Sequence, residues 1–189
     1  MRQSRRHSRK GDRGTISIVN GLSIHSRPEA VEERATAGHW EGDLITGSNN
    51  SHLATLVDRK SRFTLILKLA GKDAESVTAA LISGFRKLPK TLQKSLTWDR
   101  GMELARHEDF TKRTGIPVYF CDPQSPWQRG TNENTNGLIR QYFPKKTCLK
   151  KAKQSDIDAV MEGLNNRPRR TLKYKTPKTV ILQDVALTA

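Results

Sequence analysis

Apolar residues in the middle of this chain fall into short runs that turn-forming residues separate. Three runs rich in Leu, Ile, Val and Thr, at residues 39–47, 52–58 and 62–71, have the composition of β-strands. Only a few residues connect each run to the next. Connections this short join antiparallel neighbours, because a parallel neighbour needs a long crossover. The pattern therefore predicts a meander of three antiparallel strands.

The period of the apolar residues then changes from that of strands to that of helices. In residues 73–88 apolar side chains recur every three or four positions, which predicts a helix capped by Asp73 and ended by Pro89. Two more strands are expected at residues 94–98 and 116–121. Further helices are expected at residues 103–114, 131–142 and 154–166. Because helices separate the later strands, those strands are expected to run parallel to the first.

These elements predict an α/β fold with a mixed five-stranded sheet and helices on both faces. The order of elements is similar to that of the ribonuclease-H-like fold. We expect three parts along the chain. Residues 1–14 form a flexible basic arm with six Lys or Arg, residues 15–38 form a partly ordered lead-in, and residues 39–189 form the core with a basic C-terminal arm.

The charge of the chain indicates what kind of partner it has. With 34 Lys or Arg against 19 Asp or Glu, the net charge is +15. A surplus this large favours a polyanion through counterion release and electrostatic steering. Charge alone does not separate a DNA-binding enzyme from a ribosome-associated or RNA-binding domain.

Other features indicate the compartment. Cys121 and Cys148 lack the paired spacing of a zinc site, so we expect reduced thiols. No apolar run approaches the roughly 20 residues of a membrane span, and no apolar segment follows the basic N-terminus as in a secretory signal. The sequence therefore predicts a cytoplasmic protein without a membrane partner.

Three carboxylates stand in distinctive phrases of this basic chain. Asp43 lies in HWEGDLITG, Asp99 in SLTWDRGMEL and Glu133 in SPWQRGTNENTNG. Taken singly, each has an ordinary interpretation: a solvated strand residue, a turn former and a residue that stabilises a helix N-terminus. The predicted fold brings the three close together. Carboxylate oxygens suit Mg²⁺ or Mn²⁺, and two such ions about 4 Å apart can act on a phosphodiester.

Long phrases around these acids resemble one family. GHWEGDLI, LTWDRGMELARH, YFCDPQSPWQRGTNENTNGLIRQYFPK and LNNRPRRTLKYKTP are similar to the insertion-sequence-30 family of bacterial DDE transposases, and the resemblance runs from about Gly11 to Ala189. It implies that residues 39–189 contain a DDE catalytic core, similar to integrase catalytic cores. It also implies that Asp43, Asp99 and Glu133 are the catalytic residues and the ligands of Mg²⁺ or Mn²⁺, with two ions expected.

The resemblance implies an activity and its partners. The expected reaction is cleavage of DNA strands at insertion-sequence ends, followed by strand transfer to a target. The expected partners are double-stranded DNA, from transposon ends and target, and further copies of the chain in a homo-oligomer. Two alternatives remain open: a ribonuclease-H-like nuclease without strand transfer, and a non-catalytic DNA-binding remnant.

Members of this family also carry an N-terminal helix-turn-helix region that reads the transposon ends. Residues 1–38 show no such pattern. We therefore expect a catalytic fragment or a truncated, impaired copy.

Several residues are candidates for DNA binding. Arg140 follows Glu133 by two helical turns and shares its helix face, and Asn136 lies one turn from Glu133. From Arg140 to Lys178 there are twelve Lys or Arg against three acids, which indicates a DNA-binding track or only a solvated face. The further candidates on this track are Lys145, Lys146, Arg167, Arg169 and Arg170.

Five other residues near the acids have competing interpretations. Asp58 is expected to form a tight turn, and Glu41 shares a strand face with Asp43, so it is a rival ligand. Among the tryptophans, Trp40 and Trp98 are expected in the core, whereas Trp127 is a candidate for stacking on a base.

Overall fold

A computed structural model describes residue 18 and residues 20–188, so the predicted arm at residues 1–14 lies outside the described residues. Six strands form one sheet in the order β1-β6-β5-β2-β3-β4. The strands are β1 Leu22–Ser23, β2 His39–Thr46, β3 His52–Asp58, β4 Thr64–Lys68, β5 Ser95–Trp98 and β6 Val118–Phe120. The first long strand, β2, lies at the centre between β5 and β3, which positions its acidic residues inside the sheet.

The strand directions confirm the predicted mixed sheet. β2, β3 and β4 pair antiparallel, whereas β5 and β6 are parallel to β2. The number of strands was wrong by one. Leu22–Ser23 adds a sixth strand by pairing parallel with β6 at the edge. A strand of two residues is too short to show an alternating pattern in the sequence.

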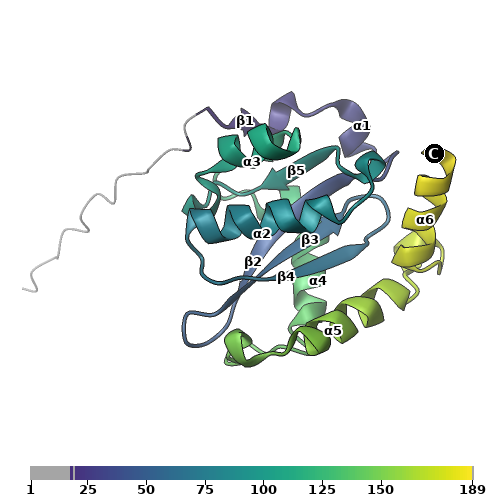
Figure 1. Ribbon diagram of the computed structural model, residues 1–189. Coiled ribbons are helices and arrows are strands. Elements are labelled where there is room, and N and C mark those ends of the chain that lie inside the picture. Colours follow the sequence, from purple (N-terminus) through teal and green to yellow (C-terminus); the bar gives the residue numbers. More distant parts are fainter. Residues whose placement is uncertain (1–17, 19, 189) are drawn as a thin grey trace, which may run out of the picture.

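Helices cover both faces of the sheet (Figure 1). The helices are α1 Glu29–Glu32, α2 Ala74–Arg86, α3 His107–Thr114, α4 Gly130–Ile139, α5 Gln154–Asn166 and α6 Pro177–Thr188. In Figure 1, α2 and α3 lie in front of the sheet and α4 lies behind it. Asp73 caps α2 as predicted, since its carboxylate accepts the Ser76 N–H at 2.8 Å. None of the described helices is long and apolar enough to cross a membrane.

Each face of the sheet has its own apolar core. On one face the fully buried rings of Trp40, Phe85, Trp98 and Phe110 pack between the sheet and helices α2 and α3. The other core joins the sheet to α4 and α5 through Ile45, Leu53, Ile66, Ile139 and Ile157. Trp40 and Trp98 are thus confirmed as core residues. Because side chains alternate along β2, placing Trp40 in the first core puts Glu41 and Asp43 on the α4 face.

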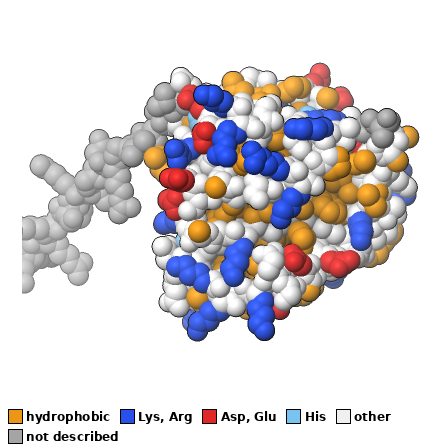
Figure 2. Space-filling model, in the orientation of Figure 1, with side chains coloured by type: hydrophobic (Ala, Val, Ile, Leu, Met, Phe, Trp, Pro, Cys, Tyr) orange, Lys and Arg blue, Asp and Glu red, His pale blue; other side chains and the backbone are white. Residues whose placement is uncertain are grey.

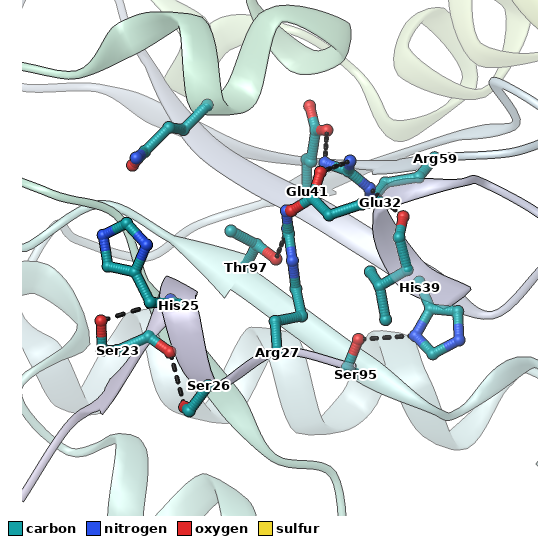
Figure 3. A network of polar contacts seen from close by, with 12 residues as sticks. Ser23, His25, Ser26, Arg27, Glu32, His39, Glu41, Arg59, Ser95 and Thr97 are labelled. Atoms are coloured by element: carbon teal, nitrogen blue, oxygen red, sulfur yellow. Dashed lines mark hydrogen bonds and ion pairs between the residues drawn. The ribbon is translucent and has the colours of Figure 1, made fainter. Parts of the chain in front are cut away.

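Buried ionic contacts attach the segment before β2 to the sheet (Figure 3). The Arg59 guanidinium donates to Glu41 at 2.5 Å and to Glu32 of α1 at 3.1 Å. Arg27 donates to the Thr97 hydroxyl of β5 at 3.0 Å and also pairs with Glu32. Buried charges are stable only when they are paired and hydrogen-bonded, as these are. The segment that carries α1 therefore packs on the same sheet as the acids.

Gly42 permits the closest approach in the centre of the sheet, because a Cβ at this position would collide with the indole ring of Trp98. We expect Gly42→Ala to lower the free energy of unfolding by about 1–3 kcal/mol, since the fully buried ring cannot move aside without strain. Urea unfolding followed by circular dichroism measures this loss.

Gly163→Ala is the matched control for this substitution. Gly163 lies in α5 with nothing within 4 Å of an added Cβ. Alanine is the better helix former, so the control is expected to gain up to about 1 kcal/mol. Equal stability of the two variants would contradict the packing described for Gly42.

Candidate active site

One buried arginine joins two of the predicted catalytic acids. Asp43 lies on β2, and Asp99 directly follows the carboxyl end of the neighbouring parallel strand β5. The Arg129 guanidinium lies 2.9 Å from a carboxylate oxygen of Asp99 and 3.3 Å from one of Asp43. It also donates to the Gly42 carbonyl at 2.9 Å. The structure therefore brings Asp43 and Asp99 together on a single countercharge.

The charges at this position affect one another. Burial raises the pKa of Asp43, and the nearby Arg129 charge opposes that rise. Burial alone would lower the pKa of Arg129, but the carboxylates of Asp43 and Asp99 outweigh it and hold that pKa above its usual value. The Arg129 guanidinium is therefore charged, and it stabilises two acids that would otherwise repel each other.

Helix α4 packs on β2 through two asparagines, one helical turn apart, that meet two acids on one face of the strand. The backbone N–H of Asn132 donates to the buried Glu41 carboxylate at 3.0 Å, and its side-chain amide donates to the Glu41 carbonyl at 2.8 Å. One turn later, the Asn136 amide donates to the Asp43 carboxylate at 2.9 Å. On β3, the Thr55 hydroxyl lies within 3.0 Å of both asparagine amide oxygens. These contacts fix both the position of α4 and the orientation of Asp43.

Asp99 borders a cavity of about 320 Å³ that the loop after β6 helps to form. Its carboxylate accepts the Gly101 N–H at 3.0 Å, and its side chain is 38% exposed. Arg129 and Cys121 also line this cavity. Burial raises the pKa of the Cys121 thiol to about 11, so this side chain is a neutral thiol at neutral pH. The exposed edge of Asp99 is the point where a substrate can reach the acids.

Glu103 is a further carboxylate beside Asp99 that the sequence reasoning overlooked. Burial raises the pKa of Glu103, and the charge of Asp99 raises it further. Its carboxylate also accepts the Trp98 indole N–H at 3.4 Å. A second carboxyl group thus lies beside Asp99, where burial and the Asp99 charge disfavour its ionised form.

Glu133 is not gathered with the two aspartates. It lies in the first turn of α4, as predicted, and its side chain is exposed. Within the described residues, no three His, Cys, Asp or Glu side chains are arranged to hold a metal ion. The assignment of Glu133 as the third catalytic acid therefore stays a prediction.

The predicted DNA-binding residues occupy different environments. Arg140 is half-buried and donates to the Thr46 carbonyl at 2.8 Å, near the end of β2. Asn136 belongs to the site itself through its bond to Asp43. Arg169 is half-buried, whereas the remaining candidates are exposed: Lys145, Lys146, Arg167 and Arg170. Their role in binding DNA stays a prediction.

Two further acids have structural partners. Asp58 accepts the N–H and the hydroxyl of Ser61 at 2.8 and 2.7 Å, which confirms its predicted turn role. Glu41 is enclosed by Arg59 and the first turn of α4. Its oxygens are already bonded, so Glu41 is a structural acid in this geometry and not a free rival ligand.

The sequence reasoning also overlooked Arg129. The residue lies in SPWQRG, immediately before α4, and no motif draws attention to it. One physical signal was available. A positive charge at a helix N-terminus is unfavourable with the helix dipole unless acids neutralise it. Arg129 therefore needed acidic partners, but the sequence does not tell which acids these are.

Positive charge also covers surfaces away from this site. Figure 2 shows Lys and Arg side chains across the face formed by α2 and α3, with a group near the turn between β2 and β3. The net charge of +15 is therefore not confined to the α4 face. Position in the fold, and not charge alone, has to identify the residues that contact a particular phosphate.

The chemistry of Asp43, Asp99 and Glu133 fits a hard divalent cation. All three offer carboxylate oxygens, the donors that Mg²⁺ and Mn²⁺ prefer. In the structure the Arg129 guanidinium already neutralises the two aspartates. A divalent ion bound to this pair of acids would have to share them with the guanidinium or displace it.

Known proteins are similar to this chain in sequence and in fold. The family model described as "Integrase core domain" matches residues 33–126. The chain is 66% identical over 188 residues to "Transposase InsI for insertion sequence element IS30C" of Escherichia coli (strain K12), covering 100% of this chain and 49% of that protein. It is 46% identical to "Transposase for insertion sequence element IS1086" of Cupriavidus metallidurans, covering 98% of this chain and 56% of that protein.

The solved catalytic core domain of BIV integrase has the same fold, with a TM-score of 0.62 and 16% identity, covering 80% of this chain and 98% of that one. This likeness confirms the predicted ribonuclease-H-like architecture. The chain spans about half the length of the curated relatives that it matches.

Removing the shared countercharge tests this geometry. We expect Arg129→Gln to lower the free energy of unfolding by about 1–3 kcal/mol without divalent metal, because two partly buried carboxylates lose their neutralising partner. Added Mn²⁺ is expected to raise the melting temperature of the variant more than that of the wild type, since the ion no longer competes with the guanidinium.

Arg113→Gln is the control, because Arg113 pairs with Asp109 only at 3.9 Å on the exposed surface of α3. This control should change stability by less than about 0.5 kcal/mol. Identical Mn²⁺ responses in Arg129→Gln and wild type would count against the competition.

Proposed function

We propose that this chain, which belongs to the insertion-sequence-30 family of transposases, catalyses metal-dependent cleavage of DNA strands at insertion-sequence ends and transfer of the freed 3′-hydroxyl to a target. Family membership supports a reaction on DNA phosphodiesters. The observation that carries the proposal is the meeting of Asp43 and Asp99 on adjacent strands at one buried guanidinium. Such a costly pair of acids is retained where negative charge has a use.

The proposed ligands of the metal are Asp43, Asp99 and Glu133. Bound Mg²⁺ or Mn²⁺, with two ions expected, would activate the attacking hydroxyl and stabilise the charge that develops on the phosphate. Asn136 orients the Asp43 carboxylate through its hydrogen bond, and the Gly101 N–H does the same for Asp99. Arg129 holds the two aspartates together, and a bound metal ion would supply a second positive charge for these acids and for the DNA phosphate.

The proposed partner is double-stranded DNA. Arg140 directly follows α4 and donates to the Thr46 carbonyl at the end of β2, and one of its terminal nitrogens is buried without a hydrogen-bond partner among the described residues. We propose that this guanidinium contacts a phosphate near the acids. The basic residues Lys145, Lys146, Arg167, Arg169 and Arg170 extend the proposed track.

Further copies of the chain are part of the proposal. A transposon has two ends that react together, so we propose a homo-oligomer in the active complex. We propose the bacterial cytoplasm as the location of the reaction, because the proposed substrate is DNA.

Loss of the Asp99 or the Glu133 carboxylate should abolish nicking of DNA. We expect Asp99→Asn and Glu133→Gln to reduce Mg²⁺-dependent nicking of a plasmid or of a duplex carrying insertion-sequence ends by at least about a hundredfold. DNA affinity should stay equal or rise, because negative charge is removed. Gel electrophoresis of the nicked product and fluorescence anisotropy of labelled DNA measure the two effects.

The matched control is Glu108→Gln, a change of an exposed acid on α3. It should nick at the wild-type rate, and chelation of Mg²⁺ should stop every active variant. Absence of nicking in the wild type would support a non-catalytic DNA-binding remnant, whereas undiminished nicking by Glu133→Gln would remove Glu133 from the mechanism.

A second measurement separates a transposase from a nuclease. With pre-cut ends that carry a free 3′-hydroxyl, we expect joined products in the presence of Mg²⁺ or Mn²⁺. Cleavage of uncut ends without any joined product would support the ribonuclease-H-like nuclease instead.

A further inference from the structure

Three arginines from separate parts of the chain line one cavity on the side of α4 that carries Thr131. Arg34 follows α1, Arg62 lies in the turn between β3 and β4, and Arg169 precedes the C-terminal helix. The cavity has a volume of about 210 Å³. Thr131 and Thr171 add hydroxyl groups to its wall. No hydrogen bond or ion pair joins these five residues to Asp43 or Asp99 in the described structure, so the cavity is separate from the two aspartates, although Asn134, next to Glu133, also lines it.

The three guanidiniums lack acidic partners. Among the described residues, none of Arg34, Arg62 and Arg169 takes part in an ion pair. The acids whose charge reaches Arg62 are engaged elsewhere, since Glu41 binds Arg59 and Asp58 binds the Ser61 turn. The charges of Glu41 and Asp58 still act on Arg62, but neither acid pairs with it, so the cluster keeps a net positive charge.

Burial increases the cost of this charge. Burial, together with the nearby Arg34 charge, lowers the pKa of Arg62 to about 10. The Nε atom of Arg169 is buried and makes no hydrogen bond within the described part of the chain. An arginine cluster of this kind is stabilised when an anion with several oxygens enters, because guanidinium groups bind phosphate through paired N–H donors.

A second cavity indicates that the anion belongs to a polymer. This cavity, of about 420 Å³, shares Arg34 with the first and is also lined by Trp127. The Trp127 indole is 73% exposed, which is unusual for so large an apolar side chain. Bases stack on exposed aromatic rings in proteins that bind nucleic-acid strands. Arg34 therefore stands between a pocket suited to phosphate and a ring suited to a base.

We infer that the pocket of Arg34, Arg62 and Arg169 binds one backbone phosphate of a DNA strand, whose adjoining nucleotide reaches Trp127. The inference rests on the proposed function for the identity of the polymer. It assigns to DNA a contact point on the face of α4 away from Asp43, so that the helix carrying Glu133 is held by DNA on one side and by the sheet on the other.

The test measures DNA affinity against salt in buffer without divalent metal, so that binding is measured whether or not the protein cuts DNA. Arg34→Gln and Arg169→Gln are each expected to weaken binding of a labelled duplex roughly tenfold and to reduce the salt slope by about 0.9. The double variant should lose little more than either single variant, because both arginines hold the same phosphate. Arg34→Lys should recover part of the loss.

Arg86→Gln is the control, an exposed arginine of the same charge at the last turn of α2 on the opposite face. It should weaken binding less than twofold. Thermal unfolding of every variant confirms that each is folded. A double variant whose salt slope falls by about 1.8, the sum of the two single losses, would overturn the shared pocket. Single variants that lose no more DNA affinity than the control would overturn it as well.

Inorganic phosphate distinguishes the two sources of the anion. Saturable phosphate binding that Arg34→Gln abolishes, together with unchanged DNA affinity, would overturn the inference, since the pocket would then serve a free anion. Mg²⁺-dependent nicking by the wild type is measured separately. If the arginine variants bind DNA as the wild type does while the wild type nicks DNA, only the pocket is refuted. If the variants lose DNA affinity while the wild type does not nick DNA, only the catalytic proposal is refuted.

Discussion

The contact of Arg129 with Asp43 and Asp99 is the interaction on which the site depends. Two carboxylates, one within β2 and one just after β5, repel each other, and partial burial increases the cost of their charge. The guanidinium offsets this cost and also binds the Gly42 carbonyl, so it is attached to the same strand that it neutralises. An arginine just before α4 thereby couples the position of that helix to the charges of two strands. Any change that moves the helix also changes the electrostatics of the acids.

The packing of α4 on the sheet follows from the dimensions of a strand and a helix. Two residues of a strand advance about 6.6 Å, and one turn of four helical residues advances about 6 Å. Glu41 and Asp43 can therefore be matched by Asn132 and Asn136, which is what the hydrogen bonds show. The inner of these acids has a structural role, because it fixes the helix, while the outer one faces the cavity side and the guanidinium. Two acids on the same strand face thus have different roles because one is more deeply buried than the other.

Much of the fold was predictable because regular spacing of apolar residues marks most of its strands and helices. The alternation in β2 and the helical spacing in α2 gave the element order, and short or long connections gave the strand directions. The edge strand Leu22–Ser23 and helix α6 were missed, the first because it is only two residues long and the second because its apolar residues show little one-sided pattern. The sequence motifs around Asp43 and Asp99 identified these two acids as site candidates. Arg129, Asn132 and the arginine pocket could not be read from the sequence, because their roles arise from contacts between segments far apart in the chain.

The central proposal is that Asp43, Asp99 and Glu133 together hold divalent metal, although Glu133 is not grouped with the two aspartates in the described residues. Isothermal titration calorimetry of Mn²⁺ binding, in the presence of DNA, tests it most directly with wild type and the variants Asp43→Asn, Asp99→Asn and Glu133→Gln. The account predicts that each substitution weakens Mn²⁺ binding at least about tenfold, which corresponds to about 1.4 kcal/mol. Wild-type Mn²⁺ affinity in Glu133→Gln would contradict it, because the exposed acid of α4 would then take no part in holding the metal.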